Sequence, residues 1–119
     1  MKLPGPDHPI TIVPSAKRVR VTFAGKTVAD STRALTLSEG GYKPVRYIPR
    51  EDADMALLER TAHASHCPYK GDASYYSIVV DGRRSENAVW SYEQPYPAVS
   101  EIAGHIAFYP GRVDAIEES

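Results

Sequence analysis

The chain has 119 residues, a length that fits one domain and leaves no room for a second independent core. Its 14 lysines and arginines and 15 aspartates and glutamates give a net charge of -1, which argues against general nucleic-acid binding. Ordinary hydrophobic (42%) and charged (24%) fractions predict a folded domain rather than a disordered chain.

The chain also carries no signal for a membrane or an oxidising compartment. Its one cysteine, Cys67, cannot form an internal disulfide, which is typical of a reducing compartment. No apolar run approaches the roughly 18 residues of a membrane span. Residues 1–6 lack the apolar core of a signal peptide. We therefore expect a cytoplasmic protein without membrane or nucleic-acid partners.

The composition favours β structure. Ten valines and seven isoleucines stand against five leucines, and β-branched side chains fit pleated strands better than helices. Ten prolines and eight glycines predict many turns and few long helices.

Several strands are predicted in the first half of the chain. Residues 1–8 form an N-terminal arm, and residues 10–13 a first short strand. Residues 18–23 alternate polar and apolar side chains, the pattern of a strand with one buried face. After a turn at residues 24–26, residues 27–30 return as the partner strand of a hairpin.

The middle of the chain is less uniform. Residues 33–37 and 45–48 read as strands, and a glycine-containing loop separates them. Residues 50–55 fit one helical turn or a polar loop, and residues 55–60 fit either a strand or a helix. Residues 61–72 hold two histidines, the cysteine, a proline and a glycine, and are predicted to be the least regular stretch.

The clearest hairpin follows. Residues 74–80 form the strongest strand pattern, the dipeptide Asp81-Gly82 signals a tight turn, and residues 87–92 return beside it. Residues 97–104 predict a short helix that stops at its final glycine.

The end of the chain completes the prediction. Residues 105–109 form a last strand, and residues 114–119 an acidic, mobile tail. The sum is a mainly β, compact single domain of coiled antiparallel sheets, a sandwich or open barrel, with one or two short helices.

Histidines and the cysteine gather in the irregular stretch. His63, His66 and Cys67 fall within five positions, but no Cys-x-x-Cys pair accompanies them, so we predict no metal and no cofactor. Cys67 is a weak candidate for a catalytic nucleophile, with His66 as base and Lys70 as the cation that stabilises a thiolate. The competing interpretation is a small buried side chain.

Aromatic residues are the most informative feature. All eight tyrosines and Trp90 lie in the middle and last thirds of the chain, and a tyrosine ring offers a stacking surface with a polar end. Arg46, Arg50 and Lys70 are candidates to bind an anion. The residues that we expect to line a ligand site are Tyr47, Arg50, Tyr69, Lys70, Tyr76, Trp90, Tyr92 and His105. A tyrosine-rich core with no cleft is the alternative.

Five segments in order resemble a known family. They are VADSTRA (28–34), YIPRED (47–52), CPYKG with ASYY (67–76), ENAVWSY (86–92) and IAGHIAFY (102–109). They resemble the family catalogued as domain of unknown function 427, also labelled nucleotidyltransferase-like, over about residues 18–114. The resemblance implies a small β-rich domain, mainly bacterial and fungal, with coiled sheets of the β-tent kind.

The resemblance adds little about activity. Some β-tent families hold zinc through paired Cys-x-x-Cys motifs, which a chain with one cysteine lacks. Neither a glycine-serine signature nor paired catalytic aspartates support the nucleotidyltransferase label. The sequence favours a domain that binds a small polar or anionic molecule in a tyrosine- and tryptophan-lined cleft. The alternatives are an enzyme that uses Cys67, or Arg50 and Lys70, and a structural or partner-binding module.

Overall fold

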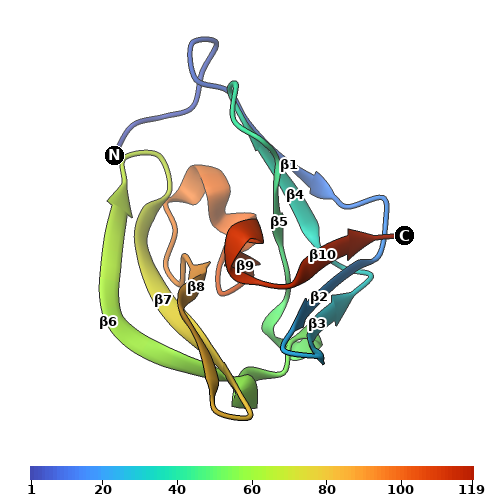
Figure 1. Ribbon diagram of the computed structural model, residues 1–119. Helices are drawn as coiled ribbons and strands as arrows, with labels where there is room; N and C mark the ends of the chain where they lie inside the picture. The colour runs from blue at the N-terminus through green and yellow to red at the C-terminus, as the bar shows by residue number, and fades with distance from the viewer.

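The computed structural model describes residues 1–119 and consists mainly of β-strands (Figure 1). The strands are β1 (Ile10–Pro14), β2 (Val19–Phe23), β3 (Lys26–Ser31), β4 (Leu35–Glu39), β5 (Val45–Tyr47), β6 (Leu58–Cys67), β7 (Gly71–Val80), β8 (Arg83–Ser91), β9 (Ile106–Phe108) and β10 (Ala115–Glu118). They form three antiparallel sheets, in the orders β1-β4-β5, β10-β2-β3 and β6-β7-β8-β9. The prediction of a mainly β domain of antiparallel sheets is confirmed.

Two hairpins follow the alternation of the sequence. In β2, the side chains of Val19, Val21 and Phe23 are buried while the intervening residues are not. The turn from β2 to β3 places Ala24 and Gly25 at positive φ, as a tight hairpin turn requires. The turn from β7 to β8 does the same at Asp81-Gly82, so both predicted hairpins are confirmed.

Isolated bridges join the three sheets into one body. Ile48, just beyond β5, exchanges two backbone hydrogen bonds with Ile106 of β9, which ties the first sheet to the four-stranded sheet. Ala29 of β3 bridges to Ala53 in the connection before β6. The larger hydrophobic core packs β2 and β3 against β7, β8 and β9. A smaller one holds Leu37, Tyr47, Tyr75 and Tyr92.

Helical structure is limited to four short 3₁₀ segments. They are η1 (Arg50–Asp52), η2 (Met55–Leu57), η3 (Pro97–Ile102) and η4 (Pro110–Arg112). The first three lie in the two regions where the sequence allowed a short helix. None of these helices has the length and apolar character needed to cross a bilayer.

Two predictions about local order are wrong. The stretch 61–72, expected to be irregular, is mostly strand, because β6 continues to Cys67 and pairs with β7. The acidic residues 114–119, expected to be a mobile tail, contain β10, whose backbone pairs with β2. β8 also begins at Arg83, four residues earlier than predicted. Neither β6 nor β10 contains a buried residue, so neither shows the alternation that marks a half-buried strand.

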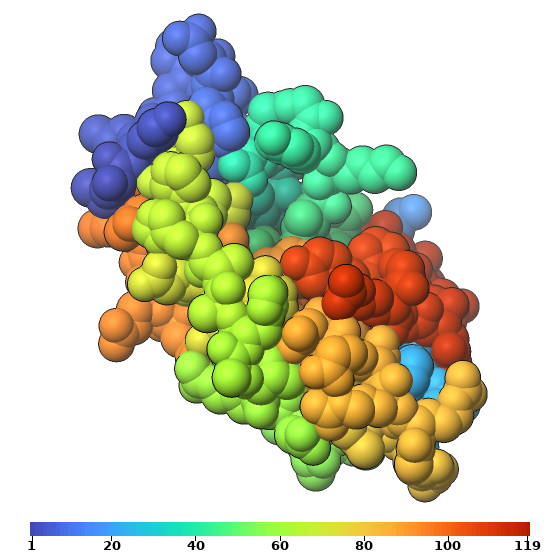
Figure 2. Space-filling model, turned by 60° about the vertical axis from the view of Figure 1, so that its left-hand side comes forward, coloured from blue at the N-terminus to red at the C-terminus, as the bar shows by residue number.

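The ends of the chain lie at defined places on the surface. The backbone N–H of Lys2 donates to the carbonyl of Pro68, so the N-terminal arm lies against the turn between β6 and β7. Figure 2 shows β6 crossing the front of the molecule and the C-terminal segment lying beside the β7–β8 hairpin. The last residue, Ser119, exchanges two backbone hydrogen bonds with Arg18.

Candidate functional site

A cleft opens where the three sheets meet. β5 contributes one wall, β2 and β10 contribute another, and residues from β8, β9 and η4 complete it. Its volume is about 480 Å³, which suits a small ligand, and eight of its thirteen lining residues are hydrophobic. The lining residues are Val19, Val21, Lys43, Pro44, Val45, Arg46, Ile48, Trp90, Phe108, Tyr109, Pro110, Ile116 and Glu118.

Trp90 is fixed in this wall by its neighbours. Its indole Nε1–H donates to the hydroxyl of Tyr47 at 3.2 Å, and the ring centroids of Trp90 and Tyr109 lie 4.5 Å apart. Tyr47 is buried, and burial raises the pKa of its hydroxyl well above the usual range. Trp90 is half-buried. The cleft therefore presents an aromatic side chain whose position is set by the core behind it.

Tyr109 is the second aromatic residue of the wall. Burial, with the hydroxyl of Tyr75 at 3.4 Å, raises the pKa of Tyr109 to about 12. The hydroxyl is therefore a neutral hydrogen-bonding group at neutral pH. The guanidinium of Arg112 lies 5.2 Å from the centroid of the Tyr109 ring.

Charged residues occupy the rim. Lys43 is exposed and makes no ion pair or hydrogen bond. Arg46 Nε donates to Glu118 Oε1 at 2.6 Å, and its terminal nitrogen lies 3.4 Å from Oε2, so one guanidinium faces both oxygens of one carboxylate. This hydrogen bond holds the pKa of Glu118 below its usual range. The rim thus already binds one carboxylate, supplied by the chain itself.

The predicted ligand residues do not form one group. Trp90 lines the cleft and Tyr47 lies behind it in the core, but Lys70 is buried elsewhere, in an ion pair with Glu39. The Lys70 ammonium also lies 5.9 Å from the centre of the Tyr92 ring. Burial raises the pKa of Tyr92 far above its usual range.

The N-terminal arm completes this ion pair. His8 Nε2 lies 2.6 Å from the second oxygen of Glu39, and the His8 ring stacks on Tyr69 at 3.8 Å. Burial favours the neutral form of Glu39, but hydrogen bonds from Lys70 and His8 outweigh it and lower the pKa of this carboxyl. Lys70 and Tyr69 therefore hold chain segments together.

Arg50 belongs to a third group. Its guanidinium donates to Gly104 O at 2.6 Å, to Tyr76 Oη at 2.9 Å and to Ser91 Oγ at 3.2 Å. A carboxylate oxygen of Glu93 lies 3.4 Å away. Arg50 and Lys70 share no partner: neighbouring residues of the chain, Ser91 and Tyr92, contact one each. The geometry does not bring the two predicted cations to one site.

His105 lies beside Arg50 and not at the cleft. Both residues line a hollow of about 300 Å³ next to η1. The His105 ring nitrogen Nδ1 lies 3.2 Å from the carbonyl oxygen of Ala103, within its own loop.

The residues of the thiol hypothesis also have other partners. His66 Nδ1 lies 2.7 Å from Asp72, and the His63 ring packs against Tyr75 at 4.4 Å. No hydrogen bond reaches the thiol of Cys67, which is partly buried at the edge of the smaller core. No group of three or more His, Cys, Asp or Glu side chains is placed to hold a metal ion.

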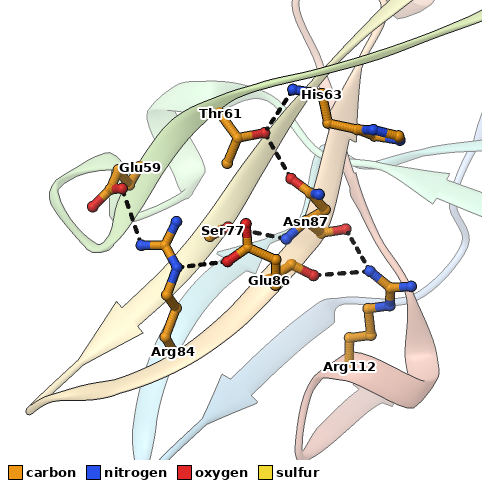
Figure 3. A network of polar contacts seen from close by, with 8 residues as sticks. All are labelled: Glu59, Thr61, His63, Ser77, Arg84, Glu86, Asn87 and Arg112. Carbon is orange, nitrogen blue, oxygen red and sulfur yellow. Dashed lines mark hydrogen bonds and ion pairs between the residues drawn. The ribbon is translucent and has the colours of Figure 1, made fainter.

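A polar network around two irregular points of the sheet stands apart from the cleft (Figure 3). Asn87 has positive φ, and its backbone N–H donates to Ser77 Oγ while its side-chain oxygen accepts from Thr61. Arg112 donates to the carbonyls of Glu86 and Asn87. These bonds satisfy backbone groups that the ladder leaves free where its register shifts.

Of the thirteen residues that line the cleft, only Trp90 was among the predicted ligand residues, and the charged rim residues Lys43 and Glu118 were not considered as site residues. Lys43 follows the glycine loop, and no motif or periodicity in the sequence marks it as a site residue. Glu118 was placed in a tail, although the apolar Ala115 and Ile116 just before it are a weak strand signal.

These features define the class of protein: a small domain of three antiparallel sheets with an aromatic-walled cleft between them. The family model named NTP_transf_9, described as "Domain of unknown function (DUF427)", matches residues 11–119, and the chain belongs to this family. The expected resemblance is therefore confirmed, over a slightly longer region than predicted. No curated protein sequence matches the chain.

Proposed function

We propose that the domain binds a small molecule with a planar, mostly apolar ring and a polar or anionic group in the cleft between the sheets. The observation that carries the proposal is the cleft itself, about 480 Å³ with mainly apolar walls and Trp90 held in position. A ring that packs against Trp90 and Tyr109 gains apolar burial and an aromatic contact.

The rim supports a polar or anionic group on the ligand. Lys43 has no ion-pair partner, and Arg46 can exchange its partner Glu118 for a group of the ligand. In this proposal Tyr47 supports the site from the core, whereas Lys70, Tyr92, Arg50 and His105 do not touch the ligand. A cytoplasmic location is part of the proposal, and the single cysteine supports it.

The test uses the only tryptophan of the chain as a reporter. Its indole N–H gives a single signal in a ¹H–¹⁵N spectrum, and this signal reports on a residue that lines the cleft, although the N–H itself donates to Tyr47 in the core behind it. We expect planar probes at millimolar concentration, among them benzoate, benzamide, indole and 2-naphthoate, to shift it in a saturable way. If no probe shifts the signal, the proposal fails.

A cleft-filling variant gives the matched test. Ile116→Phe replaces an aliphatic side chain of the cleft wall with a larger aromatic one and leaves the Trp90 reporter intact. We expect it to weaken binding of the probes at least about tenfold, in line with the cost of overpacking. Leu3→Phe makes a similar enlargement on the exposed arm and should leave binding unchanged. Equal affinities for both variants would place the probes elsewhere.

A further inference from the structure

The ion pair between Arg46 and Glu118 has an unusual position. Arg46 lies on β5 of the first sheet and Glu118 on β10 of the second, so the pair spans the mouth of the cleft between two sheets. The side chain of Glu118 is 36% exposed and that of Arg46 is 26% exposed. Ion pairs with such access to water contribute little to stability and exchange readily.

The guanidinium of Arg46 is set up to bind a carboxylate. Its two nitrogens face the two carboxylate oxygens of Glu118, the forked geometry that arginine uses for carboxylates and phosphates. Arg46 has no other hydrogen-bond partner. Any carboxylate that binds there must take the place of Glu118.

The structure also offers Glu118 an alternative position. Arg46 and Glu118 line a second hollow of about 370 Å³ together with Lys17, and Trp90 is not among the residues that line it. Lys17 makes no ion pair of its own, and its charge adds to that of Arg46 in favouring the ionised form of Glu118. A Glu118 side chain that leaves Arg46 can therefore turn toward Lys17. The β10 backbone need not move, because it stays paired with β2.

From these observations, and resting on the proposed function, we infer that the ligand of the cleft carries a carboxylate that displaces Glu118 from Arg46. Glu118 is then an internal competitor that occupies the ligand's anchoring point in the free protein. Lys43, at the same rim and unpaired, is the second cation that the carboxylate reaches. The ring of the ligand lies deeper, against Trp90.

Benzoate and benzamide test the inference because they share ring and shape and differ in charge. Glu118→Gln removes the competing charge, so we expect it to bind benzoate about fivefold more tightly than the wild type does. Its affinity for benzamide should stay within about twofold. Arg46→Met keeps the apolar stem and removes the fork, so it should weaken benzoate at least about tenfold and leave benzamide nearly unchanged. Dissociation constants come from the Trp90 indole signal.

Glu117→Gln is the matched control. Glu117 is the preceding residue of β10, exposed and without an ion pair, and its substitution changes the net charge by the same amount. We expect it to leave benzoate affinity within about twofold of wild type. Equal tightening by Glu117→Gln and Glu118→Gln would reduce the effect to net charge and overturn the inference.

The remaining outcomes separate the inference from the proposed function. One such outcome is that probes shift the Trp90 indole signal and bind equally well to wild type, Glu118→Gln and Arg46→Met. This result would leave the cleft as a binding site and overturn the inference that its ligand carries a carboxylate. Probes that never shift Trp90, even in Glu118→Gln, would overturn both. Spectra of each variant with unchanged dispersion show that the fold is retained.

Discussion

Two cation–carboxylate pairs in this domain use the same chemistry in opposite surroundings. Lys70 and Glu39 are almost removed from water, with side chains 9% and 15% exposed. Arg46 and Glu118 lie at the mouth of the cleft, two to three times more exposed. A buried charge that loses its partner has no water to replace it, whereas an exposed one does. The first is thus a structural ion pair that stays formed, and the second is an exchangeable ion pair.

The surroundings of each pair agree with this difference. Glu39 accepts from His8 as well as Lys70, and the pair links the N-terminal arm to β4 and to the turn before β7. Glu118 has one partner and room beside it. A structural ion pair needs several bonds that hold it in one arrangement. An ion pair that exchanges with a ligand needs few bonds and space into which the displaced side chain can move.

The largest effect is expected for Lys70→Met. This variant keeps the apolar stem but leaves the Glu39 carboxylate with His8 alone, which should lower the free energy of unfolding by about 3 kcal/mol. Urea denaturation at pH 7 measures it. The double variant Lys70→Met/Glu39→Leu removes both charges and should recover most of the loss. If Lys70→Met lowers the free energy of unfolding no more than the exposed control Lys17→Met does, the buried ion pair is not structural.

A smaller effect is expected from acid. The pKa of Glu39 is lowered in the folded protein, so the stabilisation it provides is complete above its ordinary value of 4.5 and is lost as pH falls through the folded value. Wild type should therefore exceed Glu39→Gln in free energy of unfolding by about 1.5 kcal/mol at pH 7. This gap should narrow steadily between pH 5 and pH 2, roughly the range in which carboxylates titrate. A gap that is constant with pH would show that the ionised carboxylate is not the stabilising group.

The fold was largely predictable because most strands have one buried face. Alternation in β2 and the Asp81-Gly82 turn each specify local structure without reference to the rest of the chain. The extent of β6 and the existence of β10 were missed because both are edge strands without a buried residue. Their pairing is a property of the neighbouring strand, and no periodicity in their own residues records it.

The site was predictable only in its residue types. The aromatic strand residues that the sequence singled out include Trp90, which lines the cleft. The sequence could not show that Ser91 and Tyr92 direct Arg50 and Lys70 into separate groups, because that depends on which sheet covers each face. Nor could it show that Arg46 meets Glu118, 72 positions later, since the two belong to different sheets.

The smallest effect on stability is expected for Glu118→Gln, and it is the result that makes the comparison sharp. A partly exposed ion pair is screened by salt and water, so its loss should change the free energy of unfolding by less than about 1 kcal/mol in urea at pH 7. Glu117→Gln, on the same strand, sets the background for a change of one charge.

If Glu118→Gln lowers the free energy of unfolding as much as Lys70→Met does, Arg46–Glu118 is a second structural ion pair. A ligand carboxylate would then have to break the fold's own support to reach Arg46, and the cleft would have no exchangeable anchor. A small loss, together with tighter benzoate binding by the same variant, would mean that the side chain matters to the ligand and hardly at all to the fold.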